Sequence, residues 1–247
     1  MTLDEILISL FPNSHEIQVS KGGLITGTGK LRDGRAISVI GLGNGESMGT
    51  AAALPLAAQV IDVISRGRDT PILVLVDLLG QLMARRDEMI GLNEYLAHLA
   101  KCLILASQSG HRTVGLEYGK ASAGGFLATA LATEIFVALP GAEPAVMDLP
   151  SMARVTKLPE EKLKELAKST PVFAPGVDSM LQMGALAQIW DANKPLDEQL
   201  EVTLKNASAK DIRDQLGAER KGRPMAALVA KRVIAAAMGT ADDLATA

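Results

Sequence analysis

Pro71-Ile72-Leu73-Val74-Leu75-Val76-Asp77 is the stretch of the chain from which the fold class can be argued. An unbroken run of aliphatic residues, bounded by a proline and an aspartate, is typical of a strand buried on both faces of a partly parallel sheet. The chain then alternates between helical and strand patterns, and we expect a helix at 87–109, a strand at 113–117, a helix at 126–132 and a strand at 135–139. This alternation predicts an α/β core.

The residues before this stretch predict antiparallel pairing. Two short apolar runs, 24–26 and 36–40, lie on either side of an Asp33-Gly34 turn, a dipeptide typical of hairpins. A glycine-rich loop at 41–49 and a helix at 50–66 are then expected to connect the hairpin to the first buried strand. The core therefore begins as a hairpin and continues as a parallel sheet.

The chain beyond Pro140 is predicted to be mainly helical. Proline and glycine recur there, and helical patterns are expected at 159–168, 176–184, 196–207, 209–219 and 224–238. We therefore expect a single domain over residues 1–247. Its predicted parts are a core at about 20–150, a helical C-terminal part at about 151–238 and a loose tail at 239–247.

Composition excludes several classes of function. Hydrophobic residues make up 48% of the chain and charged residues 21%, with a net charge of -3, so neither disorder nor a basic nucleic-acid-binding surface is expected. The single cysteine, Cys102, cannot form an internal disulfide, which favours a reducing compartment. Acids stand at the N-terminus where a signal peptide carries basic residues, and no apolar run reaches the roughly 18 residues of a membrane span. We expect a cytoplasmic protein with no nucleic-acid or membrane partner.

Three familiar motifs fail at the residues that carry their chemistry. Gly41–Gly45 has its third glycine one residue early for a dinucleotide fingerprint. Ser122 lacks the later histidine of a serine hydrolase, because the last histidine of the chain is His111. His98 and Cys102, one helical turn apart, have no further ligand in view for a metal ion. We therefore expect none of these three sites.

Two glycine-bearing loops remain as the candidate site. Asp77–Gln81 follows the first buried strand, Gly119–Gly125 follows the next, and each leads into a helix. Glycine lets a substrate approach the backbone closely, and the first N–H groups of a helix lack intrahelical partners, so two such loops can form an oxyanion hole. The alternative is that Gly124 and Gly125 only allow the helix to pack closely on the sheet. The residue pattern does not decide between the two.

Several longer stretches resemble the carboxyltransferase branch of the crotonase superfamily. Within that branch the chain is similar to the gamma subunit of biotin-independent malonate decarboxylase, from about residue 1 to about residue 238. The stretches that resemble the branch are 27–35, 80–88 and 119–125, and those similar to the gamma subunit are 91–101, 145–156 and 169–176. The resemblance implies a crotonase-like fold, a spiral of ββα units, with a helical C-terminal region.

The same resemblance implies a reaction and its partners. Together with a beta subunit, the chain would decarboxylate a malonyl thioester carried on the phosphopantetheine-type arm of an acyl carrier protein, giving the acetyl thioester and carbon dioxide. No biotin and no directly bound cofactor or metal are implied. Loss of carbon dioxide leaves an enolate, whose charge on the thioester oxygen needs preorganised hydrogen-bond donors.

Four residues of the two loops are the candidates for that task. We expect Gly124 and Gly125 to donate backbone N–H groups at one loop, and Gly80 and Gln81 to line the facing loop. One loop would then hold the leaving carboxylate while the partner subunit polarises the carbonyl. The sequence leaves open which subunit holds which group.

Three further residues are assigned roles by the same reasoning. Asp148 is a candidate proton donor to the enolate carbon, and the alternative is that it caps a helix or turn. Lys120 and Ser122 are candidates for substrate binding, since a lysine can attract a carboxylate. Leu78 and Leu79 depart from the small or turn-forming residues common in relatives, and they either seal the pocket against water or contact a partner.

Two other functions fit the same residues. The first is a subunit of a biotin-dependent acyl-CoA carboxyltransferase or decarboxylase, which shares the fold and the oxyanion chemistry but takes a biotinyl carrier. The second is a non-catalytic scaffold, whose glycine loops only pack and whose role is to stabilise a partner. The sequence also leaves open the stoichiometry of the complex and the activity of the isolated chain.

Overall fold

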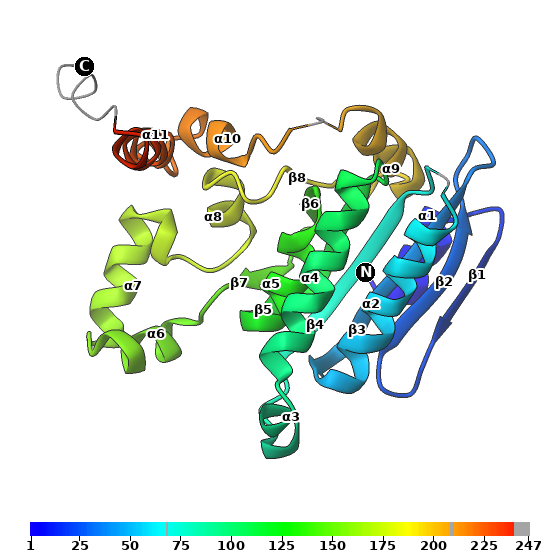
Figure 1. The fold of residues 1–247 in the computed structure, drawn as a ribbon, viewed down its shortest axis with the longest axis horizontal. Helices are drawn as coiled ribbons and strands as arrows, with labels where there is room; N and C mark the ends of the chain where they lie inside the picture. Colours follow the sequence, from blue (N-terminus) through cyan, green and yellow to red (C-terminus); the bar gives the residue numbers. More distant parts are fainter. Residues whose placement is uncertain (68, 208–209, 240–247) are drawn as a thin grey trace.

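The computed structural model describes residues 1–67, 69–207 and 210–239, which form one sheet with helices on both faces (Figure 1). The strands are β1 (His15–Val19), β2 (Leu24–Lys30), β3 (Ala36–Met48), β4 (Ile72–Gln81), β5 (Thr113–Ser122), β6 (Ile135–Ala138), β7 (Glu143–Ala145) and β8 (Gln188–Ile189). They lie in the order β1-β2-β3-β4-β5-β6-β8, with β7 beside β5. The predicted α/β class is therefore confirmed.

Helices pack on the two faces through separate hydrophobic cores. The α-helices are α1 (Leu3–Leu10), α2 (Thr50–Ser65), α3 (Arg85–Met89), α4 (Leu92–Gln108), α5 (Ala123–Ala128), α6 (Leu149–Thr156), α7 (Glu160–Ser169), α8 (Val177–Gln182), α9 (Leu196–Lys205), α10 (Arg213–Glu219) and α11 (Ala226–Ala237), and the 3-10 helices are η1 (Ala130–Ala132) and η2 (Pro171–Phe173). Helices α2, α4 and α5 cover one face, with Leu56, Leu99 and Phe126 in its core. Helices α1 and α9 cover the other, through residues such as Ile6 and Leu200.

The centre of the sheet has the predicted topology. Strands β3, β4, β5 and β6 pair in parallel, and the run 72–76 is buried throughout. Strands β2 and β3 pair antiparallel, with Lys30 opposite Ala36 and the Asp33-Gly34 turn between them. Figure 1 shows α2 and α4 lying along the same face of this sheet. The carboxyl ends of β4 and β5 therefore meet at one edge.

Three predicted loops are strands instead. The glycine-rich segment 41–49 lies almost wholly in β3, Asp77–Gln81 completes β4, and residues 119–122 complete β5. A Cβ on Gly41 would lie 2.1 Å from the carbonyl oxygen of Leu75, so this glycine permits close approach of two strands. The residue types suggested turns, but pairing between neighbouring strands extends the sheet through them.

Several short elements lie where the sequence analysis expected none. They are α1, β1, α6, β7 and β8. Strands β7 and β8 have three and two residues, too few to display a period-2 pattern. They are strands only because β5 and β6 provide pairing partners.

The C-terminal part contributes to the core of the sheet. Strand β8 pairs with β6, and Trp190 and helix α9 pack into the hydrophobic core beneath α1. The core therefore includes residues on both sides of position 150. Helices α6, α7, α10 and α11 lie to one side of the sheet (Figure 1).

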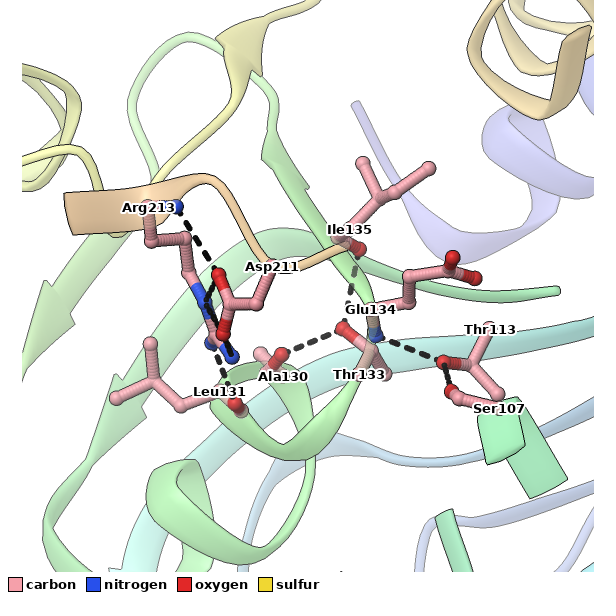
Figure 2. A network of polar contacts seen from close by, with 9 residues as sticks. All are labelled: Ser107, Thr113, Ala130, Leu131, Thr133, Glu134, Ile135, Asp211 and Arg213. Atoms are coloured by element: carbon pink, nitrogen blue, oxygen red, sulfur yellow. Dashed lines mark hydrogen bonds and ion pairs between the residues drawn. The ribbon is translucent and has the colours of Figure 1, made fainter. Parts of the chain in front are cut away.

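Polar contacts attach the start of α10 to the connection before β6. The Arg213 guanidinium donates to the carbonyl oxygen of Leu131 at 3.0 Å and pairs with Asp211 (Figure 2). Close by, the N–H of Glu134 donates to Thr113 Oγ1 at 2.7 Å, which joins the starts of β5 and β6. This network lies at the opposite end of the parallel strands from the predicted glycine loops.

The end of the described chain is the helix α11, which buries none of its residues. Val229, Val233 and Ile234 are exposed on it. The predicted loose tail lies outside the described residues, apart from Gly239. None of the helices in the described ranges is both long enough and apolar enough to cross a membrane.

Candidate active site

The carboxyl ends of β4 and β5 are held together by the side chain of Asp77. The pairing of the two strands is irregular here: Val76 lies opposite Glu117 and Leu78 opposite Ala121, so Asp77 alone on β4 faces residues 118–120 of β5. Asp77 Oδ1 accepts the N–H of Lys120 at 3.0 Å, and Oδ2 accepts the N–H of Gly45 at 3.2 Å. The carboxylate therefore ties β3, β4 and β5 together directly before the candidate residues.

The two predicted glycine segments contact each other. Gly80 has a φ of +103°, which favours glycine, and a Cβ there would lie 3.0 Å from Ser122 Oγ. A Cβ on Gly125 would lie 2.7 Å from Leu78 Cδ1 and 3.0 Å from the carbonyl oxygen of Gly80. Close packing, the alternative that the sequence left open, is thus observed at Gly125.

A hydrogen bond joins Gln81 to Gly124. The Gly124 N–H donates to Gln81 Oε1 at 2.9 Å, and Gln81 Nε2 lies 3.9 Å from Met83 Sδ. Ala123, the first residue of α5, has a φ of +50°, a strained value for a residue other than glycine. The backbone donor that we expected to meet the substrate directly is therefore engaged by a side chain from the facing strand.

Lys120 and Ser122 lie on β5 between these contacts. The Lys120 side chain is 58% exposed, and its Nζ lies 3.9 Å from Glu143 Oε2 on β7. Ser122 is half-buried beside Gly80. The hydroxyl therefore lies at the junction of the two strand ends, while the ammonium group faces an acid at the surface.

The two leucines that depart from the family pattern have different environments. Leu78 is fully buried and lies beneath Gly125. Leu79 is 56% exposed. Leu78 therefore belongs to the core, and Leu79 presents an apolar side chain at the surface.

Asp148 is the N-cap of α6. Its Oδ1 accepts the N–H of Ser151 at 2.7 Å, and hydrogen bonding from Ser151 holds the pKa of the Asp148 carboxyl below its usual value. The residue is exposed. Because an ionised capping carboxylate holds no proton to donate, this arrangement favours the capping role over the proton-donor role.

A buried acid that the sequence analysis did not single out lies on β5. Glu117 is 0% exposed, and within the described part of the chain neither of its carboxyl oxygens has a hydrogen-bond partner. Burial, together with the negative charges of Asp77 and Glu143, raises the pKa of Glu117 to about 9. Glu117 is therefore neutral at pH 7. The available signal in the sequence was an acid inside an otherwise apolar strand.

A cavity of about 1140 Å³ begins beside these strand ends. Ala145 at its edge lies opposite Ser122 in the pairing of β7 with β5. Further lining comes from α6, α8, α10 and α11 and includes Met152, Met180 and Met183. Methionine-rich apolar walls adapt to apolar ligands or to protein segments.

The described His, Cys, Asp and Glu side chains do not cluster in a way that would bind a metal ion. Across the described ranges, no group of three or more His, Cys, Asp or Glu residues could hold a metal ion. On α4, Cys102 Sγ lies 3.8 Å from His98 Nε2, and burial raises the pKa of the Cys102 thiol. A thiol that remains protonated is neither a good ligand nor a good nucleophile, so Cys102 is a core residue, while His98 is exposed.

Comparison with known proteins gives the same architecture. The chain has a TM-score of 0.79 with a chain of the Pseudomonas malonate decarboxylase hetero-tetramer in complex with coenzyme A, at 22% identity over 93% of this chain and 97% of that one. The TM-score with a chain of the Pseudomonas MdcD-MdcE hetero-dimer is 0.74, at 23% identity over 93% and 96% of the two chains. The transcarboxylase 12S core gives 0.66 at 19% identity, over 84% of this chain and 40% of that chain. These similarities confirm the carboxyltransferase-type, crotonase-like fold.

A curated relative is similar at the level of sequence. The malonyl-S-ACP:biotin-protein carboxyltransferase MADD of Malonomonas rubra is 32% identical over 155 residues, which cover 61% of this chain. The same alignment covers 52% of MADD, so this chain spans about half the length of that relative.

The family is identified by a match over most of the chain. The family model of the malonate decarboxylase gamma subunit, MdcE, matches residues 43–237. This range contains both strand ends, Asp77 and the C-terminal helices through α11. The resemblance found at 91–101, 145–156 and 169–176 is therefore confirmed, and the chain belongs to the malonate decarboxylase gamma subunit family.

Proposed function

We propose that this chain acts with a beta subunit to decarboxylate malonyl-S-acyl carrier protein. In this reaction the bond between the α-carbon and the carboxylate breaks, carbon dioxide leaves, and the electron pair forms an enolate of the thioester. A proton from water or from the partner then reaches the α-carbon, which gives the acetyl thioester. The enolate is the species that the site must stabilise.

The observation that carries this proposal is the contact between the ends of β4 and β5. Gly80 and Gln81 on one side lie against Ser122, Gly124 and Gly125 on the other. Backbone and amide N–H groups fixed at such a junction can stabilise negative charge without a titratable group of their own. Asp148, which caps α6, is not included among the proton donors.

The proposed partners follow from relatives. The Pseudomonas structures are named as a hetero-dimer and a hetero-tetramer, and MADD is named for malonyl-S-ACP. We propose a complex with a beta subunit and an acyl carrier protein, with no biotin and no cofactor bound directly to this chain. The free, buried thiol of Cys102 supports a location in the cytoplasm, and the shared core of β8 and β6 supports a single domain.

A second candidate is transfer of the carboxyl group to a biotinyl carrier. It is favoured by MADD, which is named as a biotin-protein carboxyltransferase. The two functions use the same enolate and differ in whether carbon dioxide is released or captured. The identity of the acceptor therefore separates them.

The test is carbon dioxide release from malonyl-loaded acyl carrier protein by this chain mixed with its beta subunit. Each subunit alone and the mixture with avidin are the controls, because avidin sequesters biotin. Release that needs both chains and resists avidin is the expected result. A parallel reaction adds a biotinylated carrier protein. Avidin-sensitive transfer of the carboxyl group to that carrier, with no release in its absence, would support the biotin-dependent reaction instead, and a well-assembled complex that shows neither release nor transfer would refute both.

The scaffold alternative is tested on the same complex with Gly124→Val. A side chain at position 124 would begin 3.1 Å from Leu96 Cδ1 and 3.3 Å from Gln81 Oε1, so it disturbs the junction directly. We expect turnover for each assembled complex to fall. Unchanged turnover per complex would mean that the junction only supports assembly.

A further inference from the structure

The orientation of the Gln81 side chain is set by its contact with Gly124. A backbone N–H can only donate, so the atom that it meets at 2.9 Å must be the amide oxygen Oε1. The amide nitrogen Nε2 consequently points away from Gly124. There it lies 3.9 Å from the sulfur of Met83, a weak acceptor on a side chain that is 80% exposed.

The backbone on both sides of this contact is also fixed. Gln81 lies opposite Met48 in the pairing of β4 with β3, and the N–H of Leu82 donates to the carbonyl oxygen of Met48 at 2.8 Å. Gly80, the preceding residue, is held against Ser122. The Gln81 amide is therefore anchored at its backbone and at Oε1, and among the described residues the contact given for Nε2 is the weak acceptor Met83 Sδ.

We infer that the side-chain Nε2 of Gln81 is the hydrogen-bond donor that this chain offers to the reacting thioester or carboxylate, and that the Gly124 N–H positions it. This assignment rests on the proposed function. In this arrangement Gly124 does not donate to the substrate directly. Its N–H donates to Gln81 Oε1, and Gln81 Nε2–H donates to the substrate oxygen. Gln81 donates a hydrogen bond and transfers no proton, so the proton for the α-carbon comes from water or from the partner.

Two physical arguments support an amide at this position. Donation to Oε1 polarises the amide, which strengthens the hydrogen bonds that Nε2–H can make. The amide is also neutral at every pH at which the protein is folded, so it does not repel the carboxylate of the substrate. Direct use of Gly124 would require the Gln81 side chain to leave first, at the cost of an existing hydrogen bond.

The test compares two substitutions in the assembled complex with the beta subunit. Gln81→Glu keeps an oxygen for the Gly124 N–H but replaces the Nε2 donor with a second acceptor. Gln81→Ala removes the whole amide and leaves the Gly124 N–H open to substrate. The same two changes at Gln18, an exposed residue of β1, are the matched controls. Steady-state kcat and KM are measured with malonyl-S-acyl carrier protein, per complex isolated by size exclusion.

We expect both Gln81 variants to lose kcat by on the order of 100-fold to 1,000-fold, with a smaller change in KM, as for removal of one oxyanion donor. Both Gln18 variants should match the unaltered complex. Full activity of Gln81→Glu would mean that Gln81 only positions Gly124, and would overturn the inference. Full or raised activity of Gln81→Ala would mean that the Gly124 N–H is the donor, and would also overturn it. Inactivity of the unaltered complex would instead refute the proposed function.

Discussion

Replacing Glu117 by glutamine should change how the stability of the chain depends on pH. The carboxyl is fully buried in the sheet, and its pKa is raised from 4.5 to about 9. In the unfolded chain the same group ionises near its usual pKa, so folding requires it to hold a proton throughout the interval between the two values. Glutamine has nearly the same shape and never ionises, and therefore removes this requirement.

The sign and size of the effect follow from the two pKa values. Below about pH 4.5 the group is protonated in both states and has no effect on pH dependence. As pH rises from there to about 9, the unfolded state is favoured by about 1.4 kcal/mol per pH unit. At pH 7 this linkage lowers the free energy of unfolding by about 3 kcal/mol, and the Glu117→Gln variant should not show this loss.

The assay is urea unfolding of both proteins at a series of pH values between 5 and 8. A buried glutamine brings its own fixed penalty for unpaired amide hydrogens, so the informative quantity is the difference in unfolding free energy between the two proteins as a function of pH. The unfolding free energy of the variant minus that of the unaltered chain should rise by about 1.4 kcal/mol for each pH unit. The matched control is Glu161→Gln, where the side chain is 84% exposed and the difference should stay constant.

Parallel stability curves for Glu117→Gln and the unaltered chain would refute the reasoning. They would mean that Glu117 ionises in the folded protein at its ordinary pKa, with water or a neighbouring donor reaching the carboxyl. A slope as steep in the Glu161→Gln control would also refute it, because the effect would then come from overall charge and not from burial.

Three further changes test other parts of the structure. Gly125→Ala should lower turnover by on the order of 100-fold, because a Cβ displaces the facing strand end, whereas Gly22→Ala, with nothing near its Cβ, should leave turnover unchanged. Arg213→Ala should lower the unfolding free energy by about 1–2 kcal/mol in urea, since it removes the contact that holds α10, while loss of the exposed ion pair in Arg66→Ala should have no measurable effect. Asp148→Asn should retain decarboxylation, because asparagine caps helices equally well, and a large loss would restore Asp148 as the proton donor.

The sequence predicted those parts of the fold that local patterns encode. The aliphatic run at 72–76 and the helical spacing in 87–109 mark a buried strand and the helix α4, and both are observed. The bounds at the site were wrong for a nonlocal reason. Asp77 and the glycines that follow resemble turn residues, yet the Asp77 carboxylate bonds the backbone of Lys120 and Gly45 and so keeps both strand ends within the sheet.

The candidate site was predicted only in part for a related reason. Glycine types and their positions identified the segments that meet, because close approach of two backbones needs glycine. The partner of Gly124 is a side chain 43 residues away, and no spacing rule predicts such a contact. Glu117 was missed because a strand pattern records which face a residue occupies and not whether that position is completely buried.

The two side chains that fix the strand ends differ in charge, and this difference has a chemical reason. Asp77 accepts two backbone N–H groups with a carboxylate, where one residue of β4 faces three of β5. Gln81 performs the equivalent task for Gly124 with a neutral amide. A carboxylate at position 81 would bind Gly124 more strongly, since hydrogen bonds to a charged acceptor are stronger than those to a neutral one. It would also repel the carboxylate of a malonyl group and the enolate that follows. Under the proposed function, a neutral anchor at Gln81, with the charged anchor Asp77 four residues earlier on β4, avoids placing a negative charge beside the substrate carboxylate.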